Sequence, residues 1–121
     1  MEGRKMTDPQ TTDRMTIRAH QGPVTVRFLD VVVASTERAR ELYEPGHDPV
    51  LYIPFEDVYF VYMQKTDKRT ECPRKGIASY WRIVGQGQAA ENAVWTYDDP
   101  NPAVASLKGH AAFDPKQVSF E

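Results

Sequence analysis

Alternation of apolar and polar residues, interrupted by turn-forming residues, is the dominant pattern of this chain from residue 24 onward. Residues 24–28 alternate as a half-buried strand does, and residues 31–34 form a continuous apolar run typical of a strand buried on both faces. A strand is favoured over a helical turn for residues 35–43. Further strands are predicted over residues 50–53, 57–63 and 117–120. The pattern therefore predicts a mainly β protein.

Turn signals separate these segments. In Glu44-Pro45-Gly46-His47 the proline fixes φ at the second position and the glycine accepts a positive φ at the third, which predicts a type II turn. Pro54 ends the preceding strand. Residues 64–71 are polar and charged and predict an exposed loop. Residues 1–14 are polar without a hydrophobic period, so we interpret them as a tail before a single β-rich domain over residues 15–121.

Residues 79–97 predict a β-hairpin with its turn at residues 86–87. In the simplest register Arg82 faces Glu91 and Tyr80 faces Ala93. One face then carries Tyr80, Arg82, Glu91, Trp95 and Tyr97, and the other carries Trp81, Ile83 and Val94. A slip of one residue would exchange the faces of one strand relative to the other. The two tryptophans are therefore expected on opposite faces.

One short helix is predicted near the C-terminal end of the sequence. Asn101 is a good N-cap, and Pro102 suits the first helical position, where its missing N–H has no partner to lose. Lys108 lies in the last turn and Gly109 follows it as a natural C-terminal stop. The expected architecture is mainly β with this single helix.

Composition narrows the function classes. The 121 residues suit one domain, and the net charge of -2, from 15 basic and 17 acidic residues, gives no electrostatic reason for a nucleic-acid or membrane partner. One cysteine cannot form an internal disulfide, so a cytoplasmic location is expected. That cysteine and three scattered histidines do not make a zinc site, and we expect no metal and no cofactor. The Gly-rich segment at residues 85–87 precedes no helix, so it is not a phosphate loop.

Four residues are candidates for catalysis. Cys72 has Lys75 nearby in sequence, and a neighbouring cation favours the thiolate, for which His110 or His47 could act as base. The alternative is a buried thiol acting as a small hydrophobe. Glu91 with Lys75 or Arg82 could be an acid–base pair, or only an exposed ion pair. Whether the protein is an enzyme is left open.

Seven residues of the same region are candidates for ligand binding, because small-molecule sites combine aromatic walls with a few charged groups. They are Lys75, Tyr80, Trp81, Arg82, Glu91, Trp95 and Tyr97. We expect a binding module for a small molecule of unknown identity. An enzyme using Cys72 or Glu91 with Lys75 is the first alternative, and an interaction domain acting through a sheet edge is the second. A homodimer is also left open.

Several short motifs occur in an order and spacing that resemble a known family. They are Glu44-Pro45-Gly46-His47, Cys72-Pro73 with Lys75-Gly76, Ala78-Ser79-Tyr80-Trp81, Glu91-Asn92-Ala93 with Trp95 and Tyr97, and Gly109-His110 with Ala112-Phe113. Over residues 24–121 the chain resembles the family catalogued as domain of unknown function 427. Its members are small soluble proteins common in bacteria.

The resemblance implies a β-tent architecture, in which two antiparallel sheets meet at one edge and splay apart. Some folds of this type hold zinc through four cysteines, and others hold a small cyclic ligand in an aromatic cage. The chain lacks the cysteines, so the zinc is not carried over. The family also carries a nucleotidyltransferase-like label, which no paired carboxylates or phosphate loop support here. No catalytic residues are established for transfer, so the motif residues are candidates for a pocket only, and the aromatic ones could equally fill the core. These candidates are Cys72, Lys75, Tyr80, Trp81, Glu91, Trp95, Tyr97 and His110.

Overall fold

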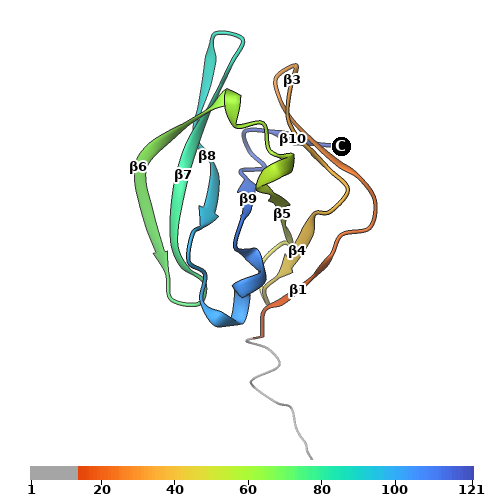
Figure 1. Cartoon of the computed structure of the whole chain (residues 1–121), viewed down its shortest axis with the longest axis vertical. Coiled ribbons are helices and arrows are strands. Elements are labelled where there is room, and N and C mark those ends of the chain that lie inside the picture. Colours follow the sequence, from red (N-terminus) through yellow and green to blue (C-terminus); the bar gives the residue numbers. More distant parts are fainter. Residues whose placement is uncertain (1–13) are drawn as a thin grey trace, which may run out of the picture.

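The computed structural model describes residues 14–121, which form strands and short 3₁₀ helices (Figure 1). The strands are β1 (Thr16–Ala19), β2 (Val24–Phe28), β3 (Val31–Thr36), β4 (Arg40–Tyr43), β5 (Val50–Pro54), β6 (Met63–Cys72), β7 (Gly76–Gly85), β8 (Gln88–Tyr97), β9 (His110–Phe113) and β10 (Ser119–Phe120). The helices are η1 (Phe55–Asp57), η2 (Phe60–Tyr62) and η3 (Pro102–Leu107). The predicted tail lies outside the described residues except for Arg14.

The strands form two open antiparallel sheets. The larger has seven strands in the order β1-β4-β5-β9-β8-β7-β6, and the smaller has three in the order β10-β2-β3. In Figure 1 strands β6, β7 and β8 lie on one side of β9, and β5, β4 and β1 lie on the other. Helix η3 lies at the lower opening between these two groups. This is the tent-like arrangement of two sheets that the resemblance implied.

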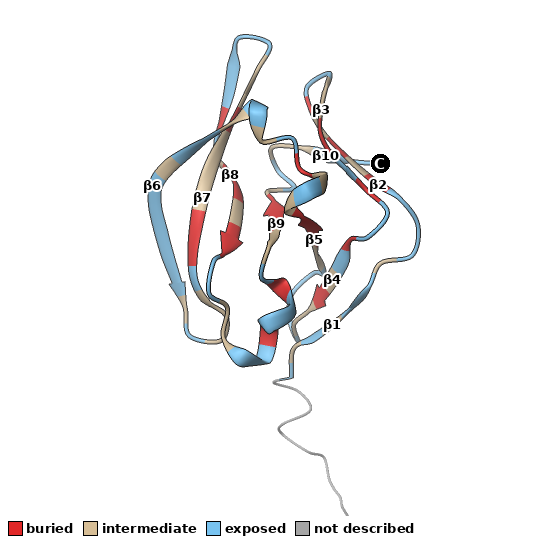
Figure 2. Cartoon of the chain, viewed as in Figure 1, coloured by how far each residue is buried: buried red, intermediate tan, exposed pale blue. Residues whose placement is uncertain are grey.

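Two buried clusters lie on opposite faces of the large sheet. Adjacent residues of a strand point to opposite faces, and each central strand contributes to both clusters. One cluster joins the two sheets and contains Val26, Val33, Ile53, Ile83, Val94, Ala111 and Phe113 among others. The second contains Leu42, Tyr52, Ala78, Tyr97, Val104, Leu107 and Ala112, so η3 covers it. Figure 2 shows the buried segments along the middle of the molecule.

The predicted hairpin is present, with a corrected register. Gln86 and Gly87 both have positive φ, 53° and 73°, as a two-residue type I′ turn requires. Beyond Ile83 a bulge sets Arg82 against residues 91–93, so Tyr80 pairs with Trp95 rather than with Ala93. The shift is an even number of residues, so the predicted faces are retained. Trp81 packs with the first cluster and Trp95 with the second, which confirms that the tryptophans are on opposite faces.

Residues 57–63 do not form the predicted strand. They follow η1 and pass through η2, and Val58 is buried and makes an isolated bridge to Ala34. The ring of Trp81 lies 6.2 Å from that of Phe55 and 5.2 Å from that of Phe60. Residues five apart in a strand point to opposite faces. Two helical turns are needed to bring both phenylalanines onto one ring.

Residues 64–71 are not the predicted loop but most of strand β6, which pairs with β7 on one side only. Their polarity reflects an exposed edge, where charged side chains discourage further strand pairing. Strands β1 and β9 were not predicted. The run at residues 31–34 was expected to be buried throughout, but only Val33 and Ala34 are buried, and Val31 and Val32 are half-buried. The reason is that β3 is an edge strand of the small sheet.

The remaining predictions agree with the structure in outline. Residues 24–28 and 50–53 are strands, residues 40–43 form β4, and the last strand is reduced to β10. At the predicted type II turn Gly46 has φ 83° and the backbone N–H of His47 donates to the carbonyl of Glu44. The predicted helix is the 3₁₀ helix η3, interrupted at Val104, and Asn101 uses its side chain on the carbonyl of Pro73 instead of capping. Within residues 14–121 no helix has the length and apolar character needed to cross a bilayer.

Candidate functional site

A cavity of about 320 Å³ lies over the second cluster, and we call it the aromatic pocket. Its lining consists of Val50, Tyr52, Lys68, Lys75, Tyr80, Asn92, Trp95, Tyr97 and Asp114. The volume falls at the lower end of the range for small-molecule sites. The structure thus brings together four of the predicted binding residues, namely Lys75, Tyr80, Trp95 and Tyr97.

Strand pairing positions the aromatic rings. Tyr80 on β7 is paired with Trp95 on β8, and their ring centroids lie 6.4 Å apart at a tilt of 41°. Ala112 on β9 is paired with Trp95 on one side and with Tyr52 of β5 on the other. The alanine carries only a methyl group, so it separates two large rings without filling the space between them. The rings of Tyr52, Trp95 and Tyr80 therefore lie along one face of the four adjacent strands β5, β9, β8 and β7.

Two tyrosine hydroxyls of the pocket are deeply buried. Tyr52 is 1% exposed and Tyr97 is 7% exposed. Burial raises the pKa of Tyr52 to about 12, against a hydrogen bond from Trp95 that lowers it, and burial also raises the pKa of Tyr97 well above its usual range. Both phenols therefore remain protonated donors at neutral pH. Among residues 14–121, neither hydroxyl has a hydrogen-bond acceptor.

The third tyrosine of the pocket differs, because the hydroxyl of Tyr80 is 2.8 Å from Oγ1 of Thr70. The ammonium group of Lys68 lies 4.7 Å from the centroid of the Tyr80 ring, in a cation–π contact. Tyr80 is thus fixed by a polar partner at one end and covered by a cation on one face. The wall that it forms is held in place before any ligand binds.

A half-buried ion pair lies next to the rings. Nζ of Lys75 donates to Oε1 of Glu44 at 3.0 Å, and the two side chains are 16% and 13% exposed. Arg74 contacts the other carboxylate oxygen at 3.3 Å. Burial is the largest influence on the pKa of Glu44 and raises it, but the hydrogen bond and charge of Lys75, together with the charges of His47 and Arg74, outweigh burial, so this pKa lies below its usual value. Lys75 is thus fixed at two points. Its side chain is held by Glu44, and its backbone N–H donates to the carbonyl of Cys72 in the turn that begins there.

Other predicted binding residues lie outside the aromatic pocket. Trp81 is on the opposite face, where its ring also contacts Nζ of Lys65 at 4.1 Å. Nε of Arg82 lies 3.0 and 2.9 Å from the two carboxylate oxygens of Glu91, so a single N–H is shared between them, and the two side chains are 34% and 59% exposed. This is the exposed ion pair given above as the alternative to an acid–base pair, and an exposed ion pair contributes little to stability.

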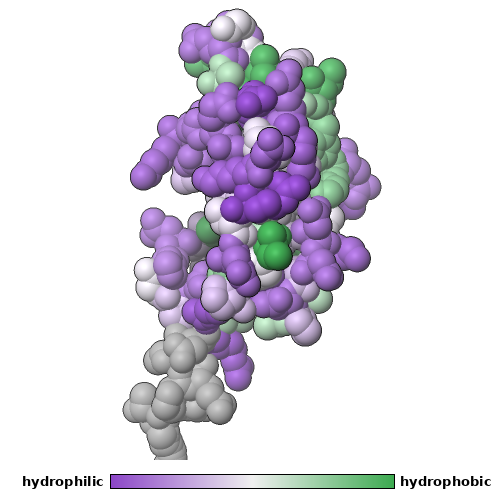
Figure 3. Space-filling model, turned by 90° about the vertical axis from the view of Figure 1, so that its left-hand side faces the viewer, coloured by the Kyte–Doolittle hydropathy of each residue, from purple (hydrophilic) through white to green (hydrophobic). Residues whose placement is uncertain are grey.

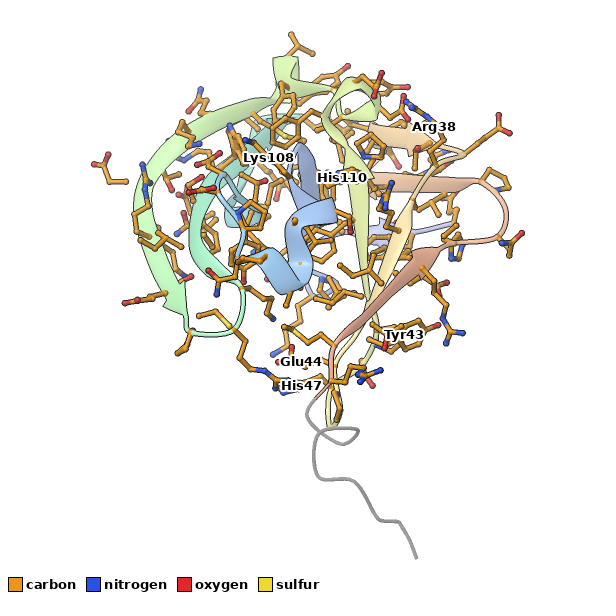
Figure 4. The ribbon with its side chains drawn as sticks, turned by 60° about the horizontal axis from the view of Figure 1, so that its bottom comes forward. Arg38, Tyr43, Glu44, His47, Lys108 and His110 are labelled. Carbon is orange, nitrogen blue, oxygen red and sulfur yellow. The ribbon has the colours of Figure 1, made fainter. Side chains whose placement is uncertain are left out.

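The catalytic candidates are not assembled into one group. Cys72 is half-buried and packs against the second cluster. His110 lines a different cavity of about 450 Å³ together with His20 and Arg38. In Figure 4 His110 and Arg38 lie on the side of the molecule away from Glu44. Burial lowers the pKa of His110, and its Nδ1 is 3.0 Å from the carbonyl of Lys108.

The sequence interpretation missed five of the nine lining residues, including Tyr52, which reads as an ordinary strand tyrosine, and Lys68, which reads as part of a loop. It also missed Glu44, the ion-pair partner of Lys75, which reads as a turn residue. One available signal was the spacing of Val50 and Tyr52, which places both on one face of a strand. Nothing local indicates that this face adjoins the hairpin, because the contact depends on sheet order. No group of three or more potential metal ligands occurs within the described part of the chain.

Comparison with known proteins agrees with the resemblance drawn from the motifs. The family described as domain of unknown function (DUF427) matches residues 16–121, which covers both sheets and every residue of the aromatic pocket. A search of curated proteins returned no significant match.

Proposed function

Since the chain belongs to the DUF427 family, whose description assigns no activity, we propose from its structure that it binds a small, flat, polar molecule in the aromatic pocket. The observation that carries this proposal is the convergence of four aromatic rings and two lysines on one cavity. The rings supply stacking surface, and Lys75 supplies charge at the rim. With a single cysteine in the chain, we also propose the reducing cytoplasm as the place of action.

The buried hydroxyls favour binding over simple core packing. A core tyrosine usually finds a partner for its hydroxyl, because an unpaired buried polar group costs free energy. In the described residues Tyr97 has no such partner, yet its side chain borders a cavity. A ligand that accepts a hydrogen bond would satisfy it. The same argument does not apply to Trp81, which packs among phenylalanines on the other face.

The two alternatives receive less support. An enzyme using Cys72 would need a base nearby, and His110 borders another cavity. Glu91 forms an exposed ion pair with Arg82, whereas Lys75, its expected partner in an acid–base pair, donates to Glu44 instead. For edge pairing, Figure 3 shows that the face over β6 is predominantly hydrophilic, and that edge strand is rich in charged side chains. Such an edge discourages pairing with another strand.

Tryptophan fluorescence tests the proposal with a built-in control. The chain has two tryptophans, so the variant Trp81→Phe leaves Trp95 as a reporter that lines the pocket. Screening this variant against flat metabolites should give ligands that change its emission and raise its melting temperature. A ligand at about 100 times its dissociation constant adds about 2.7 kcal/mol of stability.

The matched control is Trp95→Phe, whose remaining tryptophan is on the opposite face. The same ligands should leave its emission unchanged. Ligands that alter Trp81 emission and not Trp95 emission would contradict the placement of the site. A screen without any ligand that acts on Trp95 would contradict the proposed function itself.

A further inference from the structure

We infer that the ligand class of the aromatic pocket is the planar monocarboxylate, with its carboxylate held by the hydroxyls of Tyr52 and Tyr97. This inference rests on the proposed function, because it names the ligand of the same pocket. It follows from three properties of the lining, which are the direction of its hydrogen bonds, its charge and its shape.

The inner hydrogen-bonding groups are donors in search of acceptors. Tyr52 is 1% exposed, and among residues 14–121 its O–H donates to no acceptor. Tyr97 is 7% exposed and has no partner in the described part of the chain. Two O–H donors that line one cavity match in number the two oxygens of a carboxylate, and hydrogen bonds to an ionised acceptor are the stronger kind.

The charges at the rim favour one negative charge on the ligand. Lys75 is neutralised by Glu44, although an ammonium has two further protons to donate beyond the one engaged at 3.0 Å. Lys68, Lys75 and Arg74 carry three positive charges against the two carboxylates of Glu44 and Asp114, so one positive charge is in excess among these residues. The carboxylate of Asp114 already accepts hydrogen bonds within its own turn, from the backbone N–H of Lys116 and the side-chain amide of Gln117. A monoanion suits this balance better than a phosphate dianion or a cation.

The shape of the pocket sets the remainder of the ligand. Trp95 and Tyr80 form a wall tilted by 41°, and Lys68 covers the face of Tyr80. A planar ring can lie along this wall, whereas a bulky aliphatic group cannot stack on it. The cavity of about 320 Å³ limits the ligand to a small molecule of one or two rings.

Three probes of equal ring size separate these properties. Benzoate, benzamide and benzylamine are titrated into the Trp81→Phe protein, with the emission of Trp95 as the readout. Benzoate should bind most tightly, benzamide more weakly, and benzylamine not measurably. Tyr97→Phe and Tyr52→Phe should each weaken benzoate binding on the order of tenfold, since each removes one donor to a charged acceptor.

Two controls identify the cause of any loss. Tyr62→Phe removes a tyrosine hydroxyl that is exposed and outside the pocket, and it should leave benzoate binding unchanged. Lys68→Met removes the positive charge in excess, and it should weaken benzoate binding while leaving benzamide binding within about twofold. Melting curves of the variants without probe show that each remains folded.

The outcomes separate this inference from the function on which it rests. Equal binding of benzylamine and benzoate would overturn the carboxylate class and leave a pocket for flat molecules intact. Benzoate binding that is unchanged in both tyrosine variants would overturn the assignment of the donors. If none of the three probes reaches Trp95 although other flat molecules do, the class is wrong and the proposed function stands. If no molecule of any kind reaches Trp95, both fail.

Discussion

Removing the hydroxyl of Tyr97 should stabilise the protein in the absence of ligand. The substitution Tyr97→Phe keeps the ring, and therefore the packing against the second cluster, and deletes one polar atom. That atom belongs to a residue only 7% exposed and has no hydrogen-bond partner within residues 14–121. A buried polar group without a partner costs about 1–3 kcal/mol. Because the hydroxyl borders a cavity that water can enter, we expect part of this cost, a gain of about 0.5–1 kcal/mol in the free energy of unfolding.

Thermal and urea unfolding measure the effect directly. With an unfolding entropy of about 2.1 cal/mol/K per residue, the gain corresponds to a rise in Tm of about 2–4 °C. The slope of the urea transition should not change, because the surface exposed on unfolding is the same. Tyr43→Phe is the matched control, since its hydroxyl lies 2.5 Å from Oε1 of Glu41 and its loss should lower the Tm.

The sign of the change decides the argument. A loss of more than about 1 kcal/mol in Tyr97→Phe is the loss expected for a satisfied hydrogen bond. That result would refute both the unpaired state of the hydroxyl and its role as a donor to a ligand. The expected result couples gain and loss, because the variant would be more stable when free and would gain less stability from benzoate.

Three further predictions concern residues outside the lining of the aromatic pocket. Glu44→Gln leaves the largely buried charge of Lys75 without its counter-charge and should cost about 1–3 kcal/mol at neutral pH. The pKa of Glu44 is lowered from 4.5, so the stability that its carboxylate contributes is present above pH 4.5. The difference in free energy of unfolding between the wild type and Glu44→Gln, measured by urea unfolding, should vanish as pH falls through the folded-state pKa. Burial lowers the pKa of His110 from 6.5, so the unfolded chain binds the proton first, and the wild type should lose stability as pH falls below 6.5 while His110→Gln should not. Gly76→Ala should lower the Tm more than Gly87→Ala, because both glycines have positive φ but only Gly76 would bring a Cβ within 3.2 Å of a backbone oxygen.

Short-range pattern was sufficient to predict the hairpin and its two faces. The turn at Gln86 and Gly87 sets the register at one end, and alternation carries the faces along both strands. The bulge could not be predicted, because it depends on Asn92 adopting φ 53°, which few residues other than glycine accept. Its side-chain oxygen accepts a hydrogen bond from Thr66 at 2.6 Å, a contact from another strand that offsets the strain.

Segments whose structure depends on distant partners were predicted wrongly. The polar residues of β6 resemble a loop because only one edge of that strand is paired. The residues between Phe55 and Met63 resemble a strand because residues 58–63 are a continuous run of apolar residues rich in β-branched and aromatic side chains. The contacts of Phe55 and Phe60 with Trp81 favour the two helical turns η1 and η2 over a strand. In both cases the tertiary environment outweighs the local preference.

The pocket itself depends on one small residue that no local pattern singles out. Ala112 is fully buried in the central strand β9 and is paired with Tyr52 on one side and with Trp95 on the other. The substitution Ala112→Val suits a strand, so β9 should persist, but the added methyl groups would push the two rings into the cavity. We expect a cost of about 1–3 kcal/mol from overpacking and a loss of the Trp95 response to any ligand, measured in the Trp81→Phe background. Ala111→Val changes the adjacent residue, which is equally buried but faces the first cluster, so it should cost a similar amount and leave the ligand response intact. Equal ligand responses in the two variants would show that the space between Tyr52 and Trp95 is not where ligands bind.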